Sequence, residues 1–136
     1  MINLGKMSEK VGVSVSNAHT PTRARESEKV LESRLVAGVK QRGGMTVKLT
    51  SQFHKGLPDR LVLLPFHTAC FVELKSTGKT RTKLQELAGE QLEALGFRVF
   101  VIDSSEGLYD FFNRMDRRIR KINKLIESEE NGLQVQ

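Results

Sequence analysis

Two short apolar runs separated by only three residues limit the folds that this chain can adopt. The first is Arg60–Leu64, which ends at Pro65, and the second covers residues 68–75. Parallel strands need a crossover of about a dozen residues or more, so strands joined this closely must pair in opposite directions. The first run is apolar almost throughout, which is typical of a strand buried on both faces. The sequence therefore predicts a buried antiparallel hairpin.

Helical and strand-like patterns surround this hairpin. Ser27 can cap a helix whose apolar residues recur every three or four positions until Gly43 and Gly44 end it. The predicted elements are a helix over 27–42, strands over 46–50, 60–64 and 68–75, a helix over 84–95, a strand over 97–102 and a helix from about 105 to 126. Only the third and fourth strands are joined by a helical crossover. This order predicts an α/β protein with a mixed sheet covered by helices.

Length and cysteine content restrict the class of protein. A chain of 136 residues supports one domain, and its first two dozen residues are Ser/Thr-rich and weakly periodic, which indicates a basic N-terminal arm. Cys70 is the single cysteine, so neither an internal disulfide nor a multi-cysteine zinc site can form. No apolar run approaches the roughly 20 residues that cross a bilayer. We therefore expect a cytoplasmic protein without a membrane function.

The charge balance indicates the kind of partner. Lys and Arg total 22 against 16 Asp and Glu, giving a formal charge of +6 and a pI near 9.7. Such a balance favours a polyanionic partner. Because Trp is absent and aromatic residues make up 6% of the chain, stacking on bases is a poorer expectation than contact with backbone phosphates.

Three charged residues flank the predicted hairpin. Asp59 opens its first strand, and Glu73 and Lys75 close its second. Residues two apart in a strand point to the same side, so Glu73 and Lys75 share a face while Leu74 turns into the core. Antiparallel pairing then brings Asp59 beside Glu73. Two carboxylates this close repel unless a cation neutralises them, and hard oxygen ligands suit Mg²⁺ or Mn²⁺.

This arrangement resembles a known nuclease family. Pro58-Asp59 followed by Glu73-x-Lys75 is similar to the core of the PD-(D/E)XK nucleases, and the fuller pattern resembles the virus-type replication-repair nuclease (VRR-NUC) domain, in its stand-alone phage and bacterial form. The likeness covers residues 26–112, with 1–25 as a flexible arm and 113–136 as a helical extension. The segments that carry the resemblance are 28–32, 39–44, 56–65, 71–75 and 95–104, with Gln85 and Leu92 between the last two.

The resemblance implies a fold and an activity. The fold is a restriction-endonuclease-like αβββαβ core, here with an extra C-terminal helix. The activity is hydrolysis of DNA phosphodiesters by a Mg²⁺- or Mn²⁺-dependent endonuclease in a bacterial or phage-infected cell. Asp59 and Glu73 would bind the metal, with Lys75 as the catalytic lysine and a first-helix glutamate assisting. Stand-alone members resemble Holliday-junction resolvases, which implies a homodimer acting on branched DNA without an organic cofactor.

Two of the remaining site assignments concern the helices. Glu28 and Glu32 lie four apart on one helix face, and we favour Glu32 as metal ligand because Leu31 and Leu35 flank it. Either glutamate could instead be a solvent-facing acid that complements the helix dipole. Gln85 resembles the family's helix glutamine and could bind the attacked phosphate or a water.

Basic residues close to the predicted site are candidates for gripping DNA. Lys79, Arg81 and Lys83 follow Lys75 in one polar loop, where contacts with the DNA backbone would be strongly salt-dependent. Lys48 could bind phosphate or face solvent, and Arg60 could pair with a carboxylate, bind phosphate or cap its strand. The candidates for nucleic-acid contact are Lys48, Arg60, Lys79, Arg81 and Lys83.

The last helix and two alternative functions complete the expectations. Its apolar seam continues through Ile122 and Ile126, further than a small sheet can cover, which predicts a subunit interface flanked by a basic edge, unless this end is a frayed core helix.

A non-catalytic module that binds branched DNA and a nuclease directed at RNA are the competing hypotheses, since phosphates alone do not separate DNA from RNA.

Overall fold

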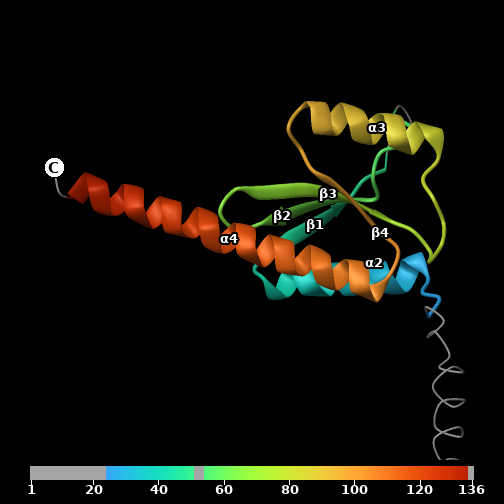
Figure 1. Ribbon diagram of the computed structural model, residues 1–136, viewed down its shortest axis with the longest axis horizontal. Helices are drawn as coiled ribbons and strands as arrows, with labels where there is room; N and C mark the ends of the chain where they lie inside the picture. Colours follow the sequence, from blue (N-terminus) through green and yellow to red (C-terminus); the bar gives the residue numbers. More distant parts are fainter. Residues whose placement is uncertain (1–23, 51–53, 135–136) are drawn as a thin grey trace, which may run out of the picture.

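A computed structural model describes residues 24–50 and 54–134, so all but two residues of the predicted arm lie outside the described residues (Figure 1). The elements follow the predicted order of helix, three strands, helix, strand and helix. They are α2 (Glu28–Gln41), β1 (Met45–Lys48), β2 (Arg60–Leu64), β3 (Thr68–Leu74), α3 (Lys83–Ala94), β4 (Val99–Ile102) and α4 (Ser105–Gln134).

The four strands form one mixed sheet in the order β1-β2-β3-β4. The first three run antiparallel, and β4 pairs parallel to β3 after the crossover through α3, as predicted. The β2–β3 hairpin pairs Arg60 with Val72 and Leu64 with Thr68. In its turn Phe66 and His67 have φ angles of 58° and 59°, the left-handed conformation that a tight hairpin connection demands.

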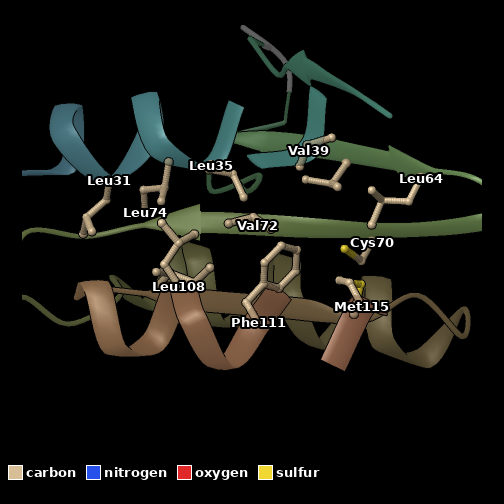
Figure 2. Close-up of a cluster of buried hydrophobic side chains, with 12 residues drawn as sticks. Leu31, Leu35, Val39, Leu64, Cys70, Val72, Leu74, Leu108, Phe111 and Met115 are labelled. Carbon is tan, nitrogen blue, oxygen red and sulfur yellow. The ribbon is translucent and has the colours of Figure 1, made fainter. Parts of the chain in front are cut away.

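The core lies between the sheet and the two helices α2 and α4, which cover the same face (Figure 1). Figure 2 shows side chains from α2 and α4 meeting the alternate residues of β3. The buried cluster comprises Leu31, Leu35, Val39, Val62, Leu64, Cys70, Val72, Leu74, Ile102, Leu108, Phe111 and Met115. Leu74 is 3% exposed, so its predicted inward orientation is confirmed.

The opposite face of the sheet is only partly covered, by α3 (Figure 1). The expectation that β2 is buried on both faces is therefore wrong: Val62 and Leu64 are buried, but Leu61 and Leu63 remain half-buried. Leucines of α3 and its C-cap also remain exposed: Leu84, Leu87 and Leu95 are 52%, 44% and 74% exposed. One helix is too narrow to cover a four-stranded sheet, and apolar surface remains on this side.

Helix α4 is held to α2 by a close contact and an ion pair. Gly38 lies so near Phe112 that an added Cβ would sit 2.3 Å from the ring. Arg42 stacks on the same ring and makes a two-pronged salt bridge to Asp116, with distances of 2.7 and 3.1 Å. The predicted division at residue 112 therefore falls inside a continuous helix, whose next turn still packs into the core. None of the helices in the described ranges is long and apolar enough to span a membrane.

Candidate active site

Asp59 and Glu73 meet at one end of the β2–β3 hairpin, as the sequence predicts. Asp59 precedes β2, and the register that pairs Arg60 with Val72 sets it beside Glu73. Its carboxylate accepts a hydrogen bond of 2.7 Å from the backbone N–H of Leu74. Lys75 follows β3 on the same side as Glu73, and its N–H donates to the carbonyl of Ile102 in β4 (2.9 Å). The three predicted residues therefore converge at one end of the two inner strands, β2 and β3.

The loop before Asp59 is fixed by a glycine and a buried proline. Gly56 has a φ of +88°, and a Cβ there would lie 2.4 Å from the carbonyl oxygen of Leu84 in the first turn of α3. Only glycine permits this approach without strain. Pro58 is fully buried immediately before Asp59. The loop thus rests on α3 and sets the position of the carboxylate.

Glu73 is the chemically unusual residue of the site. It is 1% exposed, and its Oε1 has no hydrogen-bond partner among the described residues. Burial is the largest cause that raises the pKa of this carboxyl, with Asp59 and Glu28 adding to the rise, while Lys75 and Arg81 oppose it. A buried carboxylate with an unused oxygen is unfavourable in isolation and favourable next to a cation.

The donor set fits a hard divalent cation. Mg²⁺ commonly binds one or two carboxylates and completes its coordination with water and phosphate oxygens, which Asp59 and Glu73 would allow. In residues 24–50 and 54–134 no group of three or more His, Cys, Asp or Glu side chains could hold a metal ion together. The predicted ligand set of Asp59, Glu73 and Glu32 is therefore not assembled; two carboxylates are.

Glu32, the helix glutamate preferred over Glu28, forms an ion pair in the structure. Its carboxylate pairs with Arg60, at 2.9 Å from Nε and 2.8 Å from a terminal guanidinium nitrogen. Glu28, one turn earlier in α2, is the helix glutamate whose charge acts on Glu73. The Glu32–Arg60 pair fastens α2 to β2 and occupies both of these candidate residues.

Gln85 has a structural role in the first turn of α3. Thr82 caps the helix by accepting from the N–H of Gln85 (3.3 Å), and the Gln85 side-chain oxygen accepts from the N–H of Thr82 (2.8 Å). This reciprocal capping box satisfies two free helix N–H groups. It leaves the side-chain amide nitrogen as the group of Gln85 that could donate to a phosphate.

The basic candidates divide into one inner and several outer residues. Arg81 is half-buried against Gly89, whose missing side chain leaves room for the guanidinium, and its charge acts on Glu73. Lys79, Lys83 and Lys48 are exposed. Lys48 is the last residue of β1, and Lys83 lies 3.8 Å from Glu86.

Glu26 was missed by the sequence reasoning and holds together three segments beside the site. Its carboxylate accepts from the N–H and hydroxyl of Ser105 and from Arg34 (3.0 Å). Its backbone N–H donates to the hydroxyl of Thr77 (3.0 Å), two residues after Lys75. The bond to Ser105 is the largest cause that lowers the pKa of Glu26. No local spacing indicates a cluster of residues so distant in sequence.

Comparisons with known proteins identify the family of this chain. No family model matches the sequence. "Putative nuclease p44" of Acyrthosiphon pisum secondary endosymbiont phage 1 is 40% identical over 79 residues, which cover 58% of this chain and 85% of that protein. A solved structure described as "VRR_NUC domain" superimposes with a TM-score of 0.54 at 25% identity and covers 75% of this chain and 97% of its own.

The chain belongs to the VRR-NUC nuclease family. The predicted VRR-NUC resemblance and the α/β fold with its extra C-terminal helix are thus confirmed. In this VRR-NUC domain α3 is the crossover helix that connects β3 to the parallel strand β4. Nucleases of this fold generally use divalent metals, in keeping with the two-carboxylate site.

Proposed function

We propose that this protein is a Mg²⁺- or Mn²⁺-dependent endonuclease that hydrolyses phosphodiester bonds in branched DNA. The observation that carries the proposal is Glu73, buried at 1% exposure with an unpartnered carboxylate oxygen beside Asp59. A protein gains no stability from such a group, which is why we assign it to binding a cation.

Asp59 and Glu73 would hold the divalent ion in this mechanism. The bound ion would lower the pKa of the attacking water and offset the negative charge that develops on the phosphate. The hydrogen bond from the Leu74 N–H fixes one oxygen of Asp59 and leaves its other oxygen for ligation. Glu28 replaces Glu32 as the assisting helix glutamate, because its charge reaches Glu73.

Lys75 and Arg81 would act on the phosphate. Both cations lie near enough to Glu73 to lower its pKa, so both can also stabilise charge on a phosphate bound at the same edge. The Lys75 backbone is hydrogen-bonded to β4, and its ammonium would orient the water or the phosphate. Lys79, Lys83 and Lys48 are exposed and would contact the backbone further from the cleaved bond. Gln85 would donate its amide to the phosphate.

A cleavage assay tests the enzymatic proposal. Labelled duplex, flap and four-way-junction DNA are incubated with and without Mg²⁺ or Mn²⁺. Asp59→Ala and Glu73→Gln should each abolish cleavage, while Glu90→Gln, on the exposed side of α3, should cleave at the wild-type rate. Asp59→Ala should keep or strengthen junction binding, because one negative charge is lost. Binding without cleavage in the wild type would instead indicate a non-catalytic DNA-binding module.

Comparing Glu28→Gln with Glu32→Gln tests which helix glutamate assists the metal site. Glu28→Gln should slow cleavage and leave the folding stability unchanged. Glu32→Gln should lower stability by about 1 kcal/mol through loss of its ion pair with Arg60, with a smaller effect on cleavage per folded molecule. The opposite pattern would return the assignment to Glu32.

We also propose that the active form is a homodimer. The part of α4 beyond the core extends away from the sheet (Figure 1), and Leu125 and Leu133 on it are 57% and 75% exposed. A second copy packed on this helix would cover them, and two-fold symmetry would supply two active sites, as symmetric cleavage of a junction requires. Light scattering after size exclusion should give a dimer, and Ile126→Glu should give a monomer. A wild-type monomer at micromolar concentration contradicts this proposal.

A further inference from the structure

A cavity lies at the end of β3 opposite to the catalytic residues. Its volume is about 220 Å³. The walls come from the start of β3, the segment leading into β4, and the middle of α4. The lining residues are Thr68, Ala69, Cys70, Gly96, Arg98, Phe100, Arg114, Met115, Arg117 and Arg118. Thr68 and Glu73 are five residues apart on one strand, a separation of about 16 Å, so this cavity is distinct from the proposed active site.

The cavity is strongly positive. Four of the lining residues are arginines, and none is an aspartate or glutamate. Among the described residues no ion pair joins Arg98, Arg114, Arg117 or Arg118 to a carboxylate; Asp116, on the same stretch of α4, is bound by Arg42. Four guanidinium groups that form no ion pair in the described part of the chain favour an anion with several acceptor oxygens.

The wall of the cavity also carries an unused hydrogen-bonding group. Thr68 is 2% exposed, and its hydroxyl has no partner in the part of the chain that the structure describes. A buried hydroxyl without a partner costs about 1–3 kcal/mol, and a bound anion would supply the acceptor. The apolar part of the lining consists of Phe100, Met115 and the buried Cys70.

Two of the arginines, Arg98 and Arg118, act electrostatically on the buried part of this wall. Burial raises the pKa of the Cys70 thiol to about 12, and the charges of Arg118 and Arg98 act in the opposite direction. Arg98 also lies 5.2 Å from the centre of the Phe100 ring, and both residues line the cavity. Two guanidinium groups from different elements thus line the same cavity as the unpartnered hydroxyl.

We propose that this cavity binds a phosphate group of the DNA substrate, as a contact separate from the active site. Phosphate matches the donors, because guanidinium forks and a hydroxyl are the side-chain groups that commonly contact phosphate oxygens. The proposal rests on the proposed function for the identity of the nucleic acid, but the cavity itself does not depend on catalysis. The phosphate could belong to the chain interior or to a strand end, and both have the same oxygen chemistry.

The first experiment uses inorganic phosphate as the probe and needs no nuclease activity. The melting temperature of the full chain is followed against phosphate concentration, with ionic strength held constant by chloride. Wild type and Glu73→Gln should both be stabilised by phosphate, whereas Thr68→Val and Arg98→Gln should lose most of this effect. Equal stabilisation of all four proteins would overturn the proposal, whatever the cleavage assay gives.

The second experiment measures DNA binding by fluorescence anisotropy in EDTA, where no cleavage occurs. The double variant Arg98→Gln/Arg118→Gln should bind about tenfold more weakly at physiological salt, and its salt dependence should fall by about two counterions. Lys121→Gln is the matched control, because Lys121 is exposed on α4 and does not line the cavity; it should change binding by less than half as much. A loss as large in the control would overturn the assignment.

Oligonucleotides with and without a terminal phosphate separate the two sources. If the wild type prefers phosphorylated ends and the double variant does not, the cavity binds a strand end. If both kinds of oligonucleotide lose affinity equally in the double variant, the cavity binds an internal phosphate. Stabilisation by inorganic phosphate together with unchanged DNA affinity in the double variant would refute the assignment to DNA.

Discussion

Replacing Glu73 with glutamine should make the metal-free protein more stable while abolishing its proposed activity. The carboxyl is 1% exposed, one of its oxygens is unpartnered, and burial raises its pKa above the ordinary 4.5. At pH values between the unfolded-state and folded-state pKa, the folded protein therefore keeps a proton that the unfolded chain has released. Glutamine has nearly the same shape and carries no charge to desolvate.

Linkage between protonation and folding limits the size of the effect. Each pH unit over which the folded and unfolded states differ by one proton is worth about 1.4 kcal/mol, and pH 7 lies 2.5 units above the ordinary pKa of 4.5, so the destabilisation by Glu73 at pH 7 cannot exceed about 3.5 kcal/mol. The buried amide keeps part of the cost of an unsatisfied polar group. We therefore expect Glu73→Gln to gain about 1–2 kcal/mol at pH 7, or roughly 3–8 °C in melting temperature.

The dependence on pH gives the sign of the effect. Because the folded-state pKa of Glu73 is the higher one, its contribution to stability falls as pH rises above about 4.5 and becomes constant above the folded-state pKa. The difference in unfolding free energy between Glu73→Gln and wild type should thus be absent near pH 4 and widen toward neutral pH. Urea denaturation in EDTA at a series of pH values measures it.

Two controls make this prediction refutable. Glu90→Gln, which removes an exposed carboxylate from α3, should change stability by less than about 0.5 kcal/mol at every pH. Added Mg²⁺ should stabilise the wild type more than Glu73→Gln, so the gap should narrow. A Glu73→Gln protein that is less stable than wild type in EDTA, or a gap that does not vary with pH, would refute the reasoning about this buried carboxyl.

Three further predictions concern the packing around the site. Gly38→Ala should destabilise the protein by about 1–3 kcal/mol in urea denaturation, because its Cβ would meet Phe112, and Phe112→Leu should recover part of the loss. Gly56→Ala should lower both stability and cleavage, because a Cβ at φ +88° would press on the first turn of α3 and displace the loop before Asp59; unchanged cleavage would argue against this positioning. Asp116→Asn should cost about 0.5–1.5 kcal/mol at pH 7. The hydrogen bond from Arg42 lowers the pKa of Asp116, so the stability that Asp116 contributes should disappear as pH falls below about 3.8. A stability difference between Asp116→Asn and wild type that stays constant down to pH 2 would contradict this.

The part of the site formed by the hairpin could be predicted from sequence. Antiparallel pairing through a three-residue connection fixes the register, so Asp59 had to approach Glu73, and strand alternation had to turn Leu74 inward. These are local rules of backbone geometry. They work because each strand is short and its partner is the next one along the chain.

The parts contributed by helices could not be predicted in the same way. Glu28 and Glu32 share one helix face, and only the placement of α2 on the sheet decides which of them reaches Glu73 and which meets Arg60. The role of Gln85 in a capping box is visible in the Thr-x-x-Gln spacing, which the sequence reasoning overlooked. The exposure of Leu87 depends on how α3 is placed over the sheet, which periodicity does not report.

The cluster around Glu26 determines where a functional fragment of this protein can start. Helix α2 begins at Glu28, so a shortened chain designed from the helix boundary would omit Glu26. It would then lose the bonds to Ser105 and Thr77 that hold the beginning of α4 and the loop after Lys75. Such a fragment would retain Asp59, Glu73 and Lys75 yet release the segment next to them. Truncations made to find the smallest active enzyme should therefore stop before residue 26.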